Sequence, residues 1–187
     1  MDEILGTKDY AGEQALISEE KLGRNNVFYL PYLMGERSPI NDTDARGVFL
    51  GLSLDTSRED MILAVLEGVS FAIRDSFEVA KNLGINITES CLVGGGAKSP
   101  LWRKILANVL GIKLNILKTE QGPGLGGAIL AMVGVDEYTS VNEAAEKIVE
   151  IAETVEPEKE LTALYEDRYN KYRQIYPALK NVFGNLR

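Results

Sequence analysis

Two glycine-rich segments are the residues of this 187-residue chain whose type and spacing point most clearly to ligand binding. Gly94 to Gly96 follow the apolar run Cys91-Leu92-Val93, and a second segment spans Gly122 to Gly127. Glycine has no Cβ atom, so backbone N–H groups and the start of a helix can come close to a phosphate or a purine face. Both segments are therefore candidate ligand loops.

Two nucleotide-binding motifs can be compared with these segments. Gly122 to Gly127 satisfies G-x-G-x-x-G, but a dinucleotide site also needs an acidic residue about 20 positions further on, after a second strand. The pattern predicts a helix at Ala144–Glu150 instead. Lys98-Ser99 follows a glycine run as in a P-loop, yet Ala97 and Leu92 stand where that motif requires glycine. Two interpretations stay open: one nucleotide lies between both glycine turns, or the turns serve only tight packing.

The chain contains no histidine, so any acid–base chemistry must use carboxylates. We expect Glu36, Glu67 and Asp75 to be exposed or structurally paired. Arg37 has two equal interpretations, either a contact to a phosphate or an ion pair with Glu36 or Asp42 that holds its loop.

The elements that must position the glycine turns alternate between strands and helices. Helical spacing of apolar residues, with Ser57 before them and Gly84 after them, predicts a long buried helix over about 59–83. Ser99, Pro100 and Gly111 bracket a second helix in the same way. The other expected elements are a short strand at 27–30, a long loop at 31–51, strands at 91–93 and 112–116, and helices at 128–133, 140–154 and after 157.

This alternation predicts an α/β sheet with parallel pairs, whose ligand crevice lies beyond the carboxyl ends of the strands. Both glycine turns would lie at that edge. The helix that begins at Gly126-Gly127-Ala128 should pack its small face against a neighbouring element. The last helix carries a stripe that we expect to pack on the domain rather than to form a stacking surface: Leu161, Tyr165, Tyr169, Tyr172 and Tyr176.

Length and composition bound the class of protein. At one domain per ~150 residues, the chain is one domain, or one domain with an attached piece. Twenty Lys plus Arg against 28 Asp plus Glu give a net charge of −8, which disfavours nucleic acid and anionic membranes as partners. The single cysteine, Cys91, is expected to be a buried thiol in a reducing compartment. No apolar run reaches the ~18 residues of a membrane span, and we expect a cytoplasmic protein.

Longer stretches of the sequence resemble the FGGY family of carbohydrate kinases. Gly47 to Leu52, followed after seven residues by Asp60 to Glu67, is similar to the family's second signature at every constrained position. Leu92 to Ser99, with Trp102 following, resembles the family's adenosine-binding turn. Gln121 to Ala128 resembles its second glycine segment.

Within the family, 29–39 and 45–47 are similar to the xylulokinase branch, although Ile40 stands where that branch commonly has histidine. The resemblance implies an α/β fold of the actin-like ATPase, or ribonuclease H-like, type, incomplete at its N-terminal side. It also implies in-line transfer of the ATP γ-phosphoryl group to a hydroxyl of D-xylulose, with Mg²⁺ bridging phosphate oxygens. Gluconate or another sugar remains an alternative substrate.

The resemblance further implies the binding residues. The backbone of Gly95, Gly96 and Ala97 would contact the adenosine of ATP or ADP, with the Cα of Gly96 facing the nucleotide. Ser99 would lie beside it at the helix N-terminus, and Pro100 would form part of the purine rim. No catalytic residue and no metal ligand is expected in this chain, because the family's aspartate base and phosphate loops lie upstream of the matched part.

The expected organisation is a partial C-terminal nucleotide-binding domain over 1–187, with 158–187 as a C-terminal helical extension. The expected partners are a nucleotide, a small sugar and either a second copy of the chain or a missing N-terminal domain. The chain alone is expected to be inactive. Two other classes stay open, a Rossmann-type module for NAD or FAD and a non-enzymatic interaction module.

Overall fold

The structure, a computed structural model, describes residues 9–119 and 122–186. Its helices are α2 (Tyr10–Ala15), α3 (Arg58–Asn82), α4 (Pro100–Leu110), α5 (Gly122–Gly134), α6 (Val141–Ile148), α7 (Lys159–Tyr172) and α8 (Ile175–Phe183), with 3-10 turns η1 (Glu19–Lys21) and η2 (Gly95–Lys98). Its strands are β1 (Phe28–Leu30), β2 (Val48–Leu50), β3 (Glu89–Leu92), β4 (Lys113–Leu117) and β5 (Ile151–Val155). None of the helices in the described ranges is both long and apolar enough to cross a membrane.

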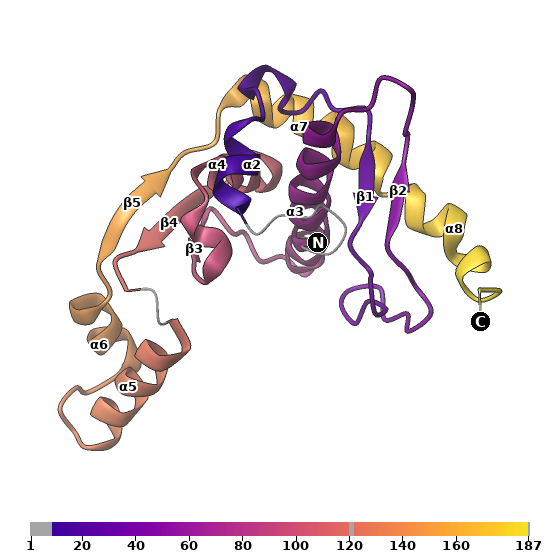
Figure 1. Cartoon of the computed structure of the whole chain (residues 1–187). Helices are drawn as coiled ribbons and strands as arrows, with labels where there is room; N and C mark the ends of the chain where they lie inside the picture. The colour runs from indigo at the N-terminus through magenta and orange to yellow at the C-terminus, as the bar shows by residue number, and fades with distance from the viewer. Residues whose placement is uncertain (1–8, 120–121, 187) are drawn as a thin grey trace.

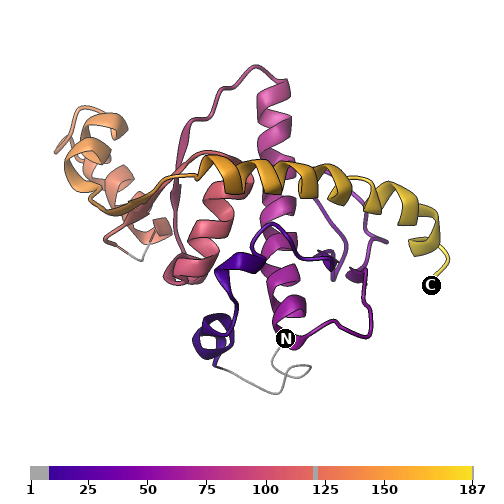
Figure 2. The ribbon, with the colours of Figure 1, turned by 90° about the horizontal axis from the view of Figure 1, so that it is seen from above.

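The long helix α3 lies in the middle of the molecule. The antiparallel pair β1–β2 lies on one side of it, and α5 and α6 form the far end of the molecule on the other side, beyond the three-stranded sheet (Figure 1). Seen from above, α7 runs across α3, and α8 continues beyond the crossing toward the C-terminus (Figure 2). Helix α4 contacts the sheet and the turn η2 on one side and α3 and α7 on the other, and so joins the sheet to the long helices.

The three-stranded sheet carries the glycine turns. β3 and β4 are parallel, with Ser90 opposite Leu114, and β5 is antiparallel to β4, with Thr154 opposite Asn115. The predicted parallel pair is confirmed. The helix predicted to reach residue 154 is wrong, because α6 ends at Ile148 and the chain continues as β5. The β-branched residues of 151–155 favour a strand when the edge of β4 is available for pairing. The periodicity of the local sequence does not show that such an edge exists.

Helix α3 begins at the expected N-terminal signal. The Ser57 hydroxyl accepts a hydrogen bond from the Asp60 N–H at 3.2 Å, and the Asp60 carboxylate accepts one from the Ser57 N–H at 3.0 Å. Halfway along the helix, a Cβ added to Gly68 would stand 2.1 Å from the carbonyl oxygen of Tyr29 in β1. Glycine therefore lets α3 and β1 pack backbone to backbone, and the helix predicted at 59–83 is confirmed.

The main core lies between α3, α4 and α7. Phe71 of α3 is 1% exposed and packs against three tyrosine rings of α7, with centroid distances between 5.1 and 6.2 Å. These rings are almost fully buried, so the prediction that the tyrosine stripe packs on the domain is confirmed. The three tyrosines are Tyr165, Tyr169 and Tyr172.

The prediction of a buried thiol at Cys91 is wrong, because this residue is exposed. β3 is an edge strand of the sheet, and along it Glu89 and Cys91 are exposed whereas Ser90 and Leu92 are half-buried. Successive side chains of a strand point to opposite faces. The apolar neighbours of Cys91 in the sequence therefore say little about the face on which its own side chain lies.

Helix α5 begins earlier and packs less than the sequence indicates. It starts at Gly122 rather than at Ala128, and among its described residues only Ile129 is buried. Gly126 and Gly127 are exposed, and a Cβ added to either would meet no atom within 4 Å. The predicted tight packing of this small face is therefore wrong within the described chain.

We accordingly expect Gly127→Ala to stabilise the 187-residue chain. Glycine in a helix costs about 0.5–1 kcal/mol relative to alanine, and the open space at Gly127 accommodates a methyl group. A thermal melt should show a Tm higher by about 1–4 °C, given the scale for chains of this size. As a control, Gly68→Ala should lower the Tm, because its Cβ meets a backbone oxygen. A lower Tm for Gly127→Ala would contradict the open face.

Candidate functional site

The first glycine turn joins β3 to α4. Gly94 has a φ of +89°, in the left-handed region that favours glycine, and turns the chain out of the strand. Gly95 to Lys98 form η2, and Ser99 then caps α4. The Ser99 Oγ accepts a hydrogen bond from the Trp102 N–H at 3.1 Å, and Pro100 occupies the first helical position. The predicted strand, glycine turn and helix are confirmed.

This turn presents backbone donors. The Ala97 N–H donates to the Gly94 carbonyl and the Ser99 N–H donates to the Gly96 carbonyl, both at 3.1 Å. The N–H groups of Gly95 and Gly96 find no acceptor within residues 9–119 and 122–186. Gly95 is exposed, and a Cβ added to it would meet nothing within 4 Å. Free N–H groups at an open turn can bind electron-rich ligand atoms.

A cavity of about 410 Å³ opens beside the turn, within the range that holds small-molecule ligands. One wall is the start of α4, and the other is α2. The Ser99 hydroxyl donates to Oε1 of Gln14, 85 residues away in the chain, and ties the walls together. Gly95, Ser99 and Pro100 of the predicted site line this cavity. Its other lining residues are Tyr10, Ala11, Gln14, Ala15, Lys98 and Leu101.

Two residues of the predicted site, Gly96 and Ala97, are not among those that line this cavity. A Cβ added to Gly96 would stand 1.7 Å from Cζ3 of Trp102, so the side of its Cα that would carry a side chain faces the indole ring. Ala97 is 8% exposed and lines a neighbouring cavity of about 350 Å³ at the carboxyl ends of β3 and β4. Sequence reasoning missed the wall formed by α2, because contact between distant segments leaves no local pattern.

The two glycine segments meet at this edge of the sheet. A Cβ added to Gly122 would lie 3.4 Å from the side chain of Val93, so the start of α5 adjoins the end of β3. The expectation that both turns share the carboxyl-end edge is confirmed. The dinucleotide interpretation is not supported, because G-x-G-x-x-G lies inside α5 and the next strand, β5, is antiparallel.

Glu67 is a structural carboxylate. It is 0% exposed, accepts a hydrogen bond from Nη2 of Arg168 at 2.7 Å and lies 3.4 Å from the N–H of Gly23. Burial raises the pKa of Glu67 to about 7, and the Arg168 guanidinium opposes this shift. The pair joins α3 to α7, as expected for a structurally paired residue.

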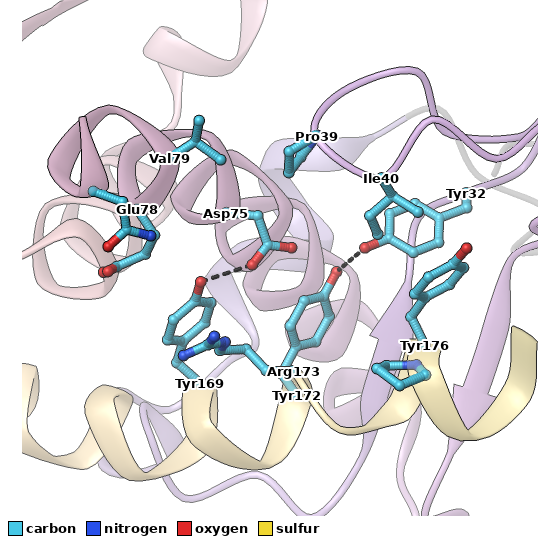
Figure 3. Close-up of a pocket in the computed structure, with 12 residues that line it drawn as sticks. Tyr32, Pro39, Ile40, Asp75, Glu78, Val79, Tyr169, Tyr172, Arg173 and Tyr176 are labelled. Atoms are coloured by element: carbon cyan, nitrogen blue, oxygen red, sulfur yellow. Dashed lines mark hydrogen bonds between the residues drawn. The ribbon is translucent and has the colours of Figure 1, made fainter.

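Asp75 belongs to a second, smaller cavity of about 270 Å³ between α3 and α7. Its carboxylate accepts a hydrogen bond from the Tyr169 hydroxyl at 2.7 Å, and the hydroxyls of Tyr32 and Tyr172 share one at 3.3 Å (Figure 3). Burial raises the pKa of Asp75, and the Tyr169 hydrogen bond opposes this shift. Asp75 is thus also structurally paired, as predicted.

The loop after β1 is held by its backbone. Glu36 and Asp42 exchange two backbone hydrogen bonds of 2.8 and 2.7 Å, and the Glu36 carboxylate accepts one from the Ser38 N–H at 3.0 Å. Arg37 is exposed and forms no ion pair with either carboxylate in the described part of the chain. The ion-pair interpretation of Arg37 is therefore not supported.

Solved structures of sugar kinases share this fold. A gluconate kinase from Lactobacillus acidophilus matches 96% of this chain with a TM-score of 0.85 and 26% identity. A xylulose kinase from the same organism matches 96% with a TM-score of 0.83 and 28% identity, and the chain covers 36% of each of these proteins. The fold is that of the actin-like, ribonuclease H-like ATPases, and the predicted fold class is confirmed.

Sequence comparison identifies the family. Xylulose kinase from Staphylococcus xylosus is 38% identical over 160 residues, which cover 86% of this chain and 33% of that protein. Residues 6–135 match the C-terminal domain of the FGGY family of carbohydrate kinases. The chain belongs to this family. It spans about a third of the length of the relatives that it matches.

Proposed function

We propose that this chain is the nucleotide-binding part of a sugar kinase that transfers the γ-phosphoryl group of ATP to a hydroxyl of D-xylulose. Similarity to xylulose kinases supports the sugar, and the gluconate kinase neighbour makes gluconate the alternative. The open cavity beside Gly95 is the observation that supports nucleotide binding by this chain. We further propose that 158–187 is a helical extension of this partial domain.

In this proposal adenosine occupies the cavity between α2 and the start of α4. The free N–H groups of Gly95 and Gly96 bind its electron-rich atoms, and the positive end of the α4 dipole favours the same side of the ligand. Ser99 already engages Gln14 and therefore sets the width of the cavity. Pro100 forms the rim.

The rest of the reaction would need groups from outside these residues. The carboxylates of Glu36, Glu67 and Asp75 are engaged in structural contacts. The described residues 9–119 and 122–186 hold no group of three or more Asp, Glu or Cys side chains arranged for a metal ion. We therefore propose that the general base that receives the hydroxyl proton comes from the sugar-binding part of the kinase.

The proposal is tested by the binding of ADP to the purified 187-residue chain. Calorimetry should show one site, and Gly95→Val should weaken it at least about tenfold, because Gly95 lines the cavity and its added Cβ would meet no protein atom within 4 Å. The Tm of this variant should stay unchanged, and the wild-type chain should not phosphorylate D-xylulose.

Gly134→Val is the matched control, because Gly134 also has open space around it but lies at the end of α5. It should leave ADP binding unchanged. Equal ADP affinity of Gly95→Val and wild type would show that this turn is not part of the site. Turnover of D-xylulose by the chain alone would contradict the proposal that the general base comes from the sugar-binding part of the kinase.

A further inference from the structure

Trp102 connects the long helix α3 to the glycine turn. Its indole N–H donates to the Leu66 carbonyl oxygen at 3.2 Å and to the Ser70 hydroxyl at 3.0 Å. The six-membered ring of the same indole lies against Gly96, where an added Cβ would stand 1.7 Å from Cζ3 and 2.3 Å from Cε3. One side chain thus spans the distance from α3 to η2.

The part of α3 that accepts the indole N–H is fixed from other sides as well. Glu67, next to Leu66, is held by Arg168 of α7 at 2.7 Å. Gly68 packs directly on the backbone of β1 at Tyr29. The indole is therefore anchored to a section of α3 that contacts both α7 and β1.

The turn itself has few other restraints. Its three consecutive glycines can adopt many backbone conformations. Within the described residues, the Ala97 and Ser99 N–H groups form hydrogen bonds inside the turn and the Ala97 carbonyl accepts one from Nε of Arg103, while the Gly95 and Gly96 N–H groups stay free. Binding is strongest when such donors already point in the right direction before the ligand arrives.

We propose that Trp102 is a positioning residue for the nucleotide. Its N–H holds the ring on which Gly96 rests, and the ring in turn sets the direction of the free N–H groups of Gly95 and Gly96. This inference rests on the proposed function, because it assigns the turn to nucleotide binding. Trp102 itself does not line the 410 Å³ cavity and acts through the backbone of the turn.

The test compares Trp102→Phe with Tyr169→Phe in the 187-residue chain. Each variant keeps an aromatic ring and removes one donor to α3, but Tyr169 bonds Asp75, in a different cavity from the turn. Trp102→Phe should weaken ADP binding in calorimetry about fivefold or more, the loss expected for one net hydrogen bond. Tyr169→Phe should bind ADP as the wild type does.

Two further measurements report on the turn itself, and the first separates positioning from a general loss of stability. In the chain without nucleotide, amide hydrogen exchange of Ala97 and Ser99 should be faster in Trp102→Phe and unchanged in Tyr169→Phe. Because Trp102 is the only tryptophan of the chain, its fluorescence should also change when ADP is added, with the Kd that calorimetry gives.

The outcomes distinguish this inference from the proposed function. If the wild type binds no ADP, the proposed function fails and the inference fails with it. If the wild type binds ADP but Trp102→Phe binds it equally well, or if the exchange of Ala97 and Ser99 does not change, only the positioning role of Trp102 is overturned.

Discussion

Replacing Arg168 with methionine should lower the free energy of unfolding by about 3–5 kcal/mol near pH 8, the range for removal of one partner from a buried ion pair. Arg168 bonds Glu67 at 2.7 Å, and their side chains are 6% and 1% exposed. Methionine fills much of the space but leaves the Glu67 carboxylate without its cation. It also removes the hydrogen bond to the Val27 carbonyl at 3.1 Å and the contact with the Phe28 ring at 4.4 Å. Urea unfolding measures the loss.

The loss should grow with pH. Burial raises the pKa of Glu67 to about 7 against the opposing effect of Arg168, so removal of Arg168 raises this pKa further. A carboxyl whose pKa is raised on folding contributes stability that is lost as the pH rises through the folded-state pKa. In the wild type the loss of stability is complete at about pH 7, near the folded-state pKa of Glu67. In Arg168→Met this pKa is higher, so the stability continues to fall above pH 7. The difference between the two proteins should therefore be larger at about pH 8.5 than at about pH 6.

Lys171→Met is the matched control on the same helix. Lys171 pairs with Asp167 at 2.6 Å, but the two side chains are 60% and 68% exposed. Exposed pairs contribute about 0–1 kcal/mol, so this variant should stay close to wild type at both pH values. Equal stability of Arg168→Met and Lys171→Met would show that the buried pair does not stabilise the fold.

Gly96→Val should also destabilise the chain, and it should do so without any nucleotide. The added Cβ would stand 1.7 Å from the Trp102 ring, which cannot retreat while its N–H bonds α3. Overpacking of this kind costs about 1–3 kcal/mol. For a chain of this size the Tm should fall by about 2–12 °C. The sequence alone suggests a different outcome, namely a weaker interaction with ATP through a Cα that faces adenosine.

A double-mutant cycle identifies the clash. In a Trp102→Ala background the indole is gone, so Gly96→Val should cost much less than it does in the wild type. Gly95→Val, one residue earlier in the same turn, should leave the Tm unchanged because its Cβ meets nothing within 4 Å. Additive costs of the Gly96 and Trp102 substitutions would mean that the destabilisation arises elsewhere in the turn.

Features of the fold that have local causes can be predicted from the amino-acid sequence. The Ser57–Asp60 capping box starts α3, and Ser99 with Pro100 starts α4, because the atoms that satisfy these helix ends lie within three residues. The order of β3, glycine turn and α4 was predictable for the same reason. Resemblance over several such segments also indicated the family that the comparisons confirmed.

Features that depend on a partner distant in the chain become visible only in the folded protein. Residues 151–155 became a strand because β4 offers an edge, Cys91 is exposed because β3 is an edge strand, and α2 forms half of the cavity from 85 residues away. The same holds inside the glycine turn. Gly95 and Gly96 are identical in the sequence, yet one faces open space and the other a tryptophan, since the direction of a missing side chain depends on the three-dimensional backbone and its neighbours.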